Sequence, residues 1–119
     1  MKEKILVLDD DPMIRTLVSR ILSRAGYEVT VVEHGEEALA RIADERPALF
    51  LLDMTMPGMS GLDVLKALKT TGVELTVLLM SGFHDPRQDK ELEALGVRAR
   101  MNKPFSISEL SQTAASLIA

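Results

Sequence analysis

Short apolar runs alternate along the chain with stretches in which apolar residues recur at helical spacing, and this alternation repeats five times. Apolar runs of about four to eight residues are typical of strands, and apolar residues at every third or fourth position are typical of one helix face. The predicted strands are residues 5–8, 27–32, 48–52, 77–80 and 97–101. Because a helix follows each strand, the pattern predicts an α/β domain with a parallel sheet.

The first and the last predicted helices have the clearest start signals. Asp11 precedes the first helix as an N-cap and Pro12 fits its first turn. Ser106 and Glu109 have the spacing of a capping box before the last helix. The side chains that we expect to be buried are Met13, Ile14, Leu17, Val18, Ile21 and Leu22 in the first helix, and Ile107, Leu110, Ala114, Leu117 and Ile118 in the last. The other helices are expected around residues 38–43, 62–68 and 86–95.

Differences between the strands predict their order in the sheet. The first, third and fourth are almost continuously apolar, as in strands that helices cover on both faces. The second and fifth alternate between apolar and polar residues, so we place them at the two edges. Right-handed crossovers then give the order 2-1-3-4-5, a doubly wound, flavodoxin-like (βα)5 fold. The order reverses between the first and third strands, and a ligand is expected in the crevice at that point.

Length and composition exclude several classes of protein. A chain of 119 residues is expected to form one domain, residues 1–119, with a core of its own. It has no cysteine, which excludes disulfides, thiolate metal sites and cysteine nucleophiles. With no long apolar span and no signal peptide, we expect a cytoplasmic protein without membrane contact. The net charge of -4 and the absence of tryptophan argue against direct nucleic-acid binding.

Polar groups that can do chemistry follow four of the five predicted strands. They are Asp9-Asp10-Asp11, Asp53, Ser81-Gly82 and Lys103-Pro104. Since the carboxyl ends of parallel strands share one edge of the sheet, these groups are expected to meet in the crevice. Carboxylates that converge repel one another, and a bound cation relieves the repulsion. With only oxygen ligands at hand, Mg2+ is the natural cation, and the pattern indicates a magnesium-dependent phosphoryl site.

Each of these groups also has a plainer structural interpretation. For Asp11 we accept it, because capping the helix explains this residue. Two further adjacent acids are more than a cap requires, so a metal role is favoured for Asp9 and Asp10. The Ser81 hydroxyl can donate a hydrogen bond to a phosphoryl oxygen, and an ion pair with the acids across the crevice is favoured for Lys103.

Taken together in this order and spacing, these motifs resemble the receiver domain of two-component response regulators over essentially the whole chain. The matching residues are Asp9-Asp10, Asp53 with Met56-Pro57 and Gly61, Ser81-Gly82, and Lys103-Pro104-Phe105. The resemblance implies a phosphoacceptor switch, not an enzyme with a separate substrate. The phosphoryl donor would be a phosphohistidine on a histidine kinase or histidine phosphotransfer domain.

The resemblance also implies a role for each site residue. Asp53 would be the phosphoacceptor. Asp10 would bind Mg2+ directly, Asp9 would help through water, and the backbone carbonyl of Thr55 would complete the protein ligands. Ser81 would contact the phosphoryl group. Lys103 would pair with Asp53 and then with the phosphoryl oxygens, and the bond that joins it to Pro104 would be cis.

One residue departs from the family pattern, and several alternatives stay open. Arg100 stands where a switch aromatic is usual, three residues before the Lys-Pro pair, and a guanidinium does not bury as a ring does. A pseudo-receiver that is never phosphorylated is one alternative function. A haloacid-dehalogenase-type phosphatase is another, because Asp9 and Asp11 form its D-x-D pattern. An output domain, fused or separate, and the choice between a stand-alone regulator and a piece of a longer regulator or hybrid kinase also stay open.

Overall fold

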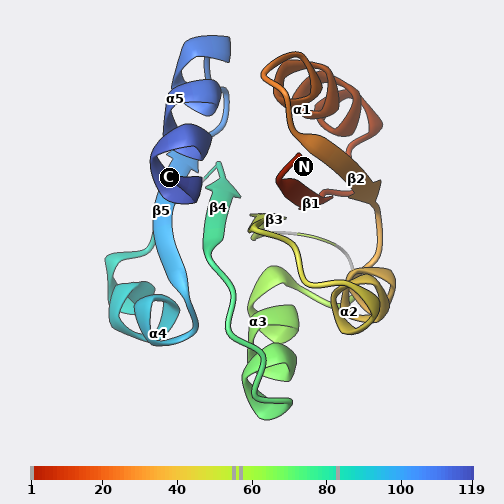
Figure 1. Ribbon diagram of the computed structural model, residues 1–119. Helices are drawn as coiled ribbons and strands as arrows, with labels where there is room; N and C mark the ends of the chain where they lie inside the picture. The colour runs from red at the N-terminus through yellow and green to blue at the C-terminus, as the bar shows by residue number, and fades with distance from the viewer. Residues whose placement is uncertain (1, 55, 57, 83) are drawn as a thin grey trace.

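Five parallel strands form one sheet with helices on both faces (Figure 1). The structure is a computed structural model, and it describes residues 2–54, 56, 58–82 and 84–119. The strands are β1 (Lys4–Leu8), β2 (Glu28–Val32), β3 (Leu49–Asp53), β4 (Val77–Ser81) and β5 (Val97–Asn102). Their order is β2-β1-β3-β4-β5, as predicted, with the two alternating strands at the edges.

Successive side chains of each central strand enter two different cores, one on each face of the sheet. Leu6 and Leu8 of β1 lie in the core beneath α2 (Gly35–Asp44) and α3 (Gly61–Thr70). Ile5 and Val7 lie in the opposite core, which α1 (Pro12–Arg24) and α5 (Ile107–Ile118) cover. In Figure 1 these two pairs of helices lie on opposite sides of the strands. The doubly wound α/β fold is therefore confirmed.

The fourth helix is shorter than the sequence pattern predicts. Residues Pro86–Gln88 form a 3-10 turn, and α4 proper spans Asp89–Ala94. The Asp85 side chain accepts a hydrogen bond from the Arg87 amide, and the Gln88 amide donates to the Asp85 carbonyl at 3.0 Å. This cap closes a tight turn first, so the α-helix begins three residues later than expected.

Three of the side chains expected in the core are exposed. Met13 and Leu17 of α1 have 80% and 42% of their surface accessible, and Ile107 of α5 has 64%. In α1 the buried contacts with the sheet come from Val18, Ile21 and Leu22, and in α5 from Leu110 and Ala114. The apolar stripe of each helix is therefore wider than the strip that the sheet covers, and its margin faces solvent.

The edge strand β5 contains an irregularity that its alternating pattern does not reveal. Val97 pairs with Val77, but Ala99 pairs with Leu78, so Arg98 is an extra residue between them. A bulge of this kind reverses which face the following residues point to. Val97 consequently packs against the core under α2 and α3, whereas Ala99 packs against the core under α1 and α5.

In the described part of the chain, no helix is both long and apolar enough to cross a membrane.

Candidate metal and phosphoryl site at the carboxyl edge of the sheet

The four predicted polar patches do meet at one edge of the sheet. Asp9 follows β1, Asp53 ends β3, Ser81 ends β4, and Lys103 follows β5. These strands are parallel neighbours, and their common direction brings the four ends together. Asp53 and Ser81 are 5% and 2% exposed, so they line the inner part of the edge and not its rim.

Three carboxylates form the centre of the site. One carboxylate oxygen from each of Asp9, Asp10 and Asp53 lies within 4.8 Å of the others. Asp9 and Asp53 are buried, and Asp10 is exposed. Hard oxygen donors at this spacing suit a small divalent cation, because its charge offsets their mutual repulsion. The donor set therefore fits a metal site, and Asp10 gives it an open side.

Protein donors hold the Asp9 side chain on both of its oxygens. The Asp11 amide donates to Oδ1 at 2.9 Å, and the Lys103 ammonium donates to Oδ2 at 2.8 Å. The backbone of Asp9 is tied as well, since its amide donates to the Val32 carbonyl at 3.2 Å. The Asp9 carboxylate is therefore fully buried and held by the protein on both of its oxygens.

Lys103 contacts two of the three carboxylates. Its Nζ lies 2.8 Å from Asp9 Oδ2 and 3.6 Å from Asp53 Oδ1. The ion pair across the crevice is thus present, but the shorter contact is with Asp9, whereas the family resemblance implied Asp53. Burial alone would lower the pKa of Lys103, but the hydrogen bond to Asp9 and the charges of Asp53 and Asp9 outweigh it and raise the pKa above its usual value.

The turn after β5 fixes the position of Lys103. The Lys103–Pro104 peptide bond is cis, as the resemblance implied. The Lys103 amide also donates to the Ser81 carbonyl at 2.9 Å, which joins the ends of β4 and β5. Ser81 and Lys103 therefore approach the carboxylates from a common backbone junction.

Close backbone packing between the start of α3 and the end of β3 holds Asp53 in place. The side chain of Ser60 accepts a hydrogen bond from the Asp63 amide at 3.2 Å in a capping box that begins α3. The first residue of α3 is Gly61, whose amide donates to the Met54 carbonyl at 3.2 Å. A Cβ at Gly61 would lie 2.7 Å from the backbone oxygen of Asp53, so only glycine allows this approach.

Two residues of the predicted motif lie outside the described residues. They are Thr55, which was predicted to offer a carbonyl to the metal, and Pro57 of the loop after Asp53. Met56 between them is 8% exposed and packs in the core beneath α2 and α3, which agrees with a packing role.

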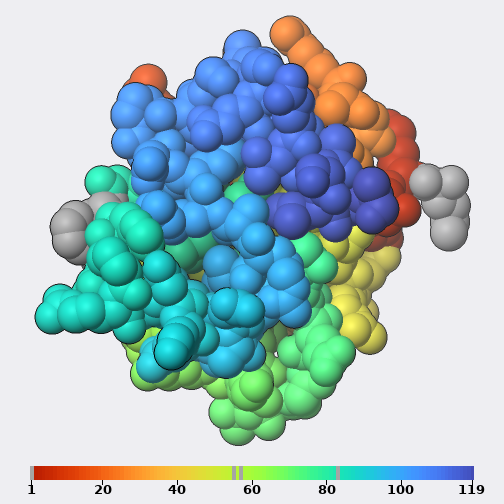
Figure 2. Space-filling model, turned by 90° about the vertical axis from the view of Figure 1, so that its left-hand side faces the viewer, coloured from red at the N-terminus to blue at the C-terminus, as the bar shows by residue number. Residues whose placement is uncertain are grey.

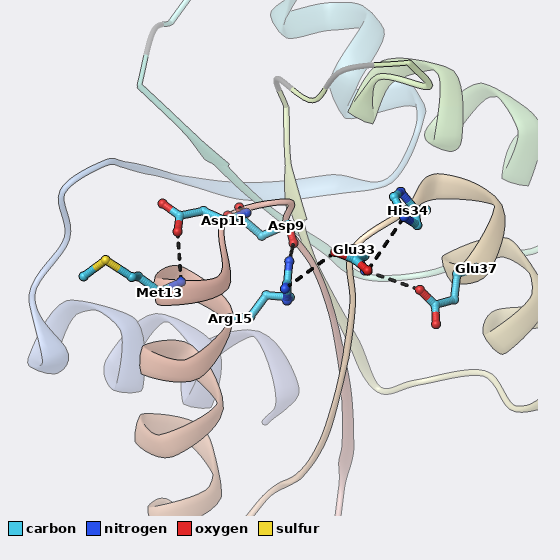
Figure 3. Close-up of polar contacts among 7 residues, drawn as sticks. All are labelled: Asp9, Asp11, Met13, Arg15, Glu33, His34 and Glu37. Carbon is cyan, nitrogen blue, oxygen red and sulfur yellow. Dashed lines mark hydrogen bonds and ion pairs between the residues drawn. The ribbon is translucent and has the colours of Figure 1, made fainter.

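The sequence reasoning missed Arg15, one turn into α1. Its Nη1 donates to the backbone carbonyl of Asp9 at 2.8 Å, and its Nη2 lies 3.7 Å from Glu33 Oε2 (Figure 3). Its side chain is only 19% exposed. The available signal was an arginine four residues after Asp11. Charge patterning alone does not distinguish such a residue from an exposed surface arginine.

Arg100, which replaces the usual aromatic, lies on the face of β5 that α4 covers. It pairs with Leu79 in register, and its Nη1 donates to the Asn102 side-chain oxygen at 2.8 Å. Together with Lys90 and Arg98 it lines a groove between α4 and β5. Figure 2 looks onto the face of the molecule formed by α4, β5 and α5, where this groove lies. The guanidinium is thus tethered along the strand and is half-buried.

Fold and site together define a class of signalling domain, and comparison with known families agrees. The family model of the response regulator receiver domain matches residues 5–115. The chain therefore belongs to the receiver domain family of two-component response regulators.

Individual relatives show the range of proteins in which this domain occurs. Sporulation initiation phosphotransferase F of Bacillus subtilis is 36% identical over 110 residues, which are 92% of this chain and 89% of the relative. The alkaline phosphatase synthesis transcriptional regulatory protein PhoP of Bacillus subtilis is 38% identical over 112 residues, 93% of this chain but 46% of the relative. The chain thus spans nearly the whole of the first and about half of the second.

Solved structures show the same fold. Chemotaxis protein CheY4 of Vibrio cholerae superposes with a TM-score of 0.91 at 31% identity, over 98% of this chain and 99% of that one. NtrX of Brucella abortus superposes with a TM-score of 0.87 at 33% identity, over 99% of this chain and 27% of that one.

Proposed function

We propose that residues 1–119 form one receiver domain that accepts a phosphoryl group on Asp53 from a phosphohistidine of a histidine kinase or histidine phosphotransfer domain. The observation that supports this most strongly is the environment of Asp53. Its carboxylate lies within 4.8 Å of those of Asp9 and Asp10, and 3.6 Å from the Lys103 ammonium. A nucleophilic carboxylate beside a fixed cation and a pair of metal-binding acids suits phosphoryl transfer.

The reaction follows from these positions. An oxygen of Asp53 attacks the phosphorus in line, the bond from phosphorus to the histidine nitrogen breaks, and that nitrogen keeps the electron pair. Lys103 moves its hydrogen bonds from the carboxylates toward the phosphoryl oxygens, and Ser81 donates to one of them. A water molecule later attacks the phosphorus, the bond from phosphorus to the Asp53 oxygen breaks, and inorganic phosphate leaves as the carboxylate is restored. The domain takes part in its own phosphorylation and dephosphorylation, so it is a switch and not an enzyme with a separate substrate.

We propose Mg2+ as the cation of the acidic cluster. Asp10 and Asp53 would hold it directly with the Thr55 carbonyl, and Asp9 would act through water. When bound, Mg2+ would offset the negative charge of the phosphoryl oxygens. The support on this chain is the all-oxygen donor set, together with the open side that the exposed Asp10 provides.

The structure supports the phosphatase alternative less well. In that mechanism Asp9, the first acid of the D-x-D pattern, would be the nucleophile. Asp9 is fully buried, and both of its carboxylate oxygens accept hydrogen bonds from the protein. Asp11, the second acid, caps α1 by accepting a hydrogen bond from the Met13 amide at 2.9 Å. Neither side chain is placed to act on a phosphomonoester.

An exposed apolar surface beside the site supports docking of a protein donor. Met13 and Leu17 lie with Pro12 and Arg20 along one shallow groove of α1. Both α1 and α5 begin at the carboxyl edge of the sheet, so this groove and the exposed Ile107 lie at the same end of the molecule as Asp53. We propose that the phosphohistidine domain docks on this surface. We also propose that the receiver acts on an output domain, which is either fused to it or a separate protein.

Intact mass after incubation with a small-molecule phosphodonor tests the proposal. The wild-type chain should gain one phosphoryl group in the presence of Mg2+ and none after chelation. Asp53→Asn should gain none. The matched control is Asp11→Asn, which keeps the helix cap because asparagine caps as well as aspartate, and it should be phosphorylated like the wild type. Wild type that gains no mass from this donor or from a phosphohistidine partner would indicate a pseudo-receiver.

A further inference from the structure

Asp10 is held differently from the other carboxylates of the cluster. Lys103 contacts both Asp9 and Asp53. Asp10 is exposed, and in the described part of the chain no hydrogen bond or ion pair engages its carboxylate. The direction in which the Asp10 side chain points therefore depends on the backbone that leads into it.

Arg15 fixes this backbone. Its Nη1 donates to the carbonyl oxygen of Asp9 at 2.8 Å, and that oxygen belongs to the peptide unit that joins Asp9 to Asp10. Because a peptide unit is planar, holding its oxygen sets the orientation of the whole unit up to the Cα of Asp10. One residue further on, the Asp11 amide donates to Asp9 Oδ1 at 2.9 Å. The backbone around Asp10 is thus restrained on both sides.

A second element holds Arg15 in this position. Its Nη2 lies 3.7 Å from Oε2 of Glu33, the residue that follows β2. Its Nη1 points toward Asp9 (Figure 3). The planar guanidinium can serve both groups at once with two different nitrogens, which a lysine ammonium cannot reproduce with the same geometry. Arg15 therefore links the turn that follows β1 to the turn that follows β2.

We propose that Arg15 is a positioning residue for the cation site: it orients Asp10 and thereby sets the affinity of the acidic cluster for Mg2+. The choice of Mg2+ rests on the proposed function. A simple charge argument predicts the opposite sign, because removing a positive group beside three carboxylates should strengthen cation binding. The direction of the change in affinity therefore separates positioning from charge.

Calorimetric titration of the unphosphorylated full chain with Mg2+, at fixed ionic strength, measures this direction. Arg15→Met keeps an apolar stem of similar length but loses the donors, and it should raise the Kd about tenfold, as is common when a group that orients a metal ligand is removed. The matched control is Arg24→Met, an exposed arginine in the last turn of the same helix, which should leave the Kd unchanged. An unchanged or lower Kd for Arg15→Met would overturn the proposal.

Arg15→Lys keeps the test valid if the methionine variant does not fold. It retains the charge but loses the forked geometry, and its Kd should lie between those of wild type and Arg15→Met. A wild-type Kd in a folded Arg15→Lys would contradict positioning, and so would a wild-type chain that binds no Mg2+. The titration contains no phosphodonor, so a failure of Asp53 phosphorylation would refute the proposed function without altering this result.

Discussion

At the scale of single residues, the site concentrates more negative charge than its one lysine balances. One carboxylate oxygen from each of Asp9, Asp10 and Asp53 lies within 4.8 Å of the others. The Lys103 ammonium contacts two of these carboxylates, at 2.8 Å and 3.6 Å. Such an arrangement is unfavourable for the metal-free fold and favourable for binding a cation and a phosphoryl group. Function and stability therefore make opposite demands on these residues.

Replacing Asp10 should separate the two demands. Asp10→Asn removes one of the repelling charges, and we expect the metal-free chain to become more stable by about 1 kcal/mol, the scale of one such repulsion near water. The same variant should bind Mg2+ much more weakly. Urea unfolding with a chelator, together with a Mg2+ titration, measures both effects. Lower stability of Asp10→Asn without metal would show that repulsion among the carboxylates does not destabilise the metal-free fold.

Replacing Lys103 should have the reverse effect on stability. Lys103→Met leaves the buried Asp9 carboxylate without its cation and should lower the free energy of unfolding by about 3 kcal/mol at neutral pH, while the chain still folds. Urea unfolding by circular dichroism measures the change. The control is the exposed Lys90→Met, which should change stability by less than about 0.5 kcal/mol. Equal stabilities of the two variants would show that Lys103 does not stabilise the fold by offsetting the charge of the carboxylates.

The raised pKa of Lys103 also predicts a pH dependence. Because the pKa is higher in the folded chain, the charged lysine stabilises the fold fully below its unfolded-state pKa of about 10.5. That stabilisation is lost as the pH rises through the higher folded-state value. The wild-type chain should therefore lose stability above about pH 10 more steeply than Lys103→Met does. Parallel curves for the two proteins would contradict the raised pKa.

At the scale of the elements, tight packing between α3 and the end of β3 holds Asp53 in place. Gly61→Ala would put a Cβ 2.7 Å from the Asp53 backbone oxygen and 3.0 Å from the Met54 Cα. Since both are backbone atoms, we expect a loss of about 1–3 kcal/mol in unfolding free energy and slower phosphorylation of Asp53. Gly82→Ala is the stability control, because among the described residues nothing lies within 4 Å of the added Cβ.

The helix α1 has an exposed and a buried apolar side, and they should respond differently to truncation. Leu22 is fully buried, and Leu22→Ala should cost about 3 kcal/mol. Leu17 is 42% exposed, so Leu17→Ala should cost less than about 0.5 kcal/mol. If α1 receives the phosphohistidine domain, Leu17→Ala should slow transfer from a protein donor and leave transfer from a small donor unchanged. Equal rates with the protein donor would place the docking surface elsewhere.

At the scale of the whole molecule, a cation bound to the folded state should stabilise the entire domain. Four strands and their connections meet at the site, and a ligand that binds only the folded chain adds about 2.7 kcal/mol at a concentration of 100 Kd. We expect Mg2+ to raise the Tm of wild type in proportion to the logarithm of its concentration. The Tm of Asp10→Asn should barely respond, and an equal rise in both proteins would indicate binding outside the acidic cluster.

Most of the fold and much of the site could be predicted because they depend on local patterns. Continuous apolar runs marked the central strands, alternation marked the edge strands, and the polar groups after β1, β3, β4 and β5 had to meet once those strands were parallel. The predictions were wrong where contacts with neighbouring elements determine which side chains are buried and where a helix begins. Examples are the exposed Met13 and Ile107, and the shorter α4.

The sequence by itself determined the order of the strands, the edge at which the site forms and the acids and lysine that compose it, because periodicity and strand direction are properties of the chain. Only the tertiary structure decided how these groups pair. It placed Lys103 closer to Asp9 than to Asp53, inserted Arg98 as a bulge in β5, and brought Arg15 to the carbonyl of Asp9. These contacts join residues on different elements, and differences of about one ångström in their packing determine which of several possible partners each side chain reaches.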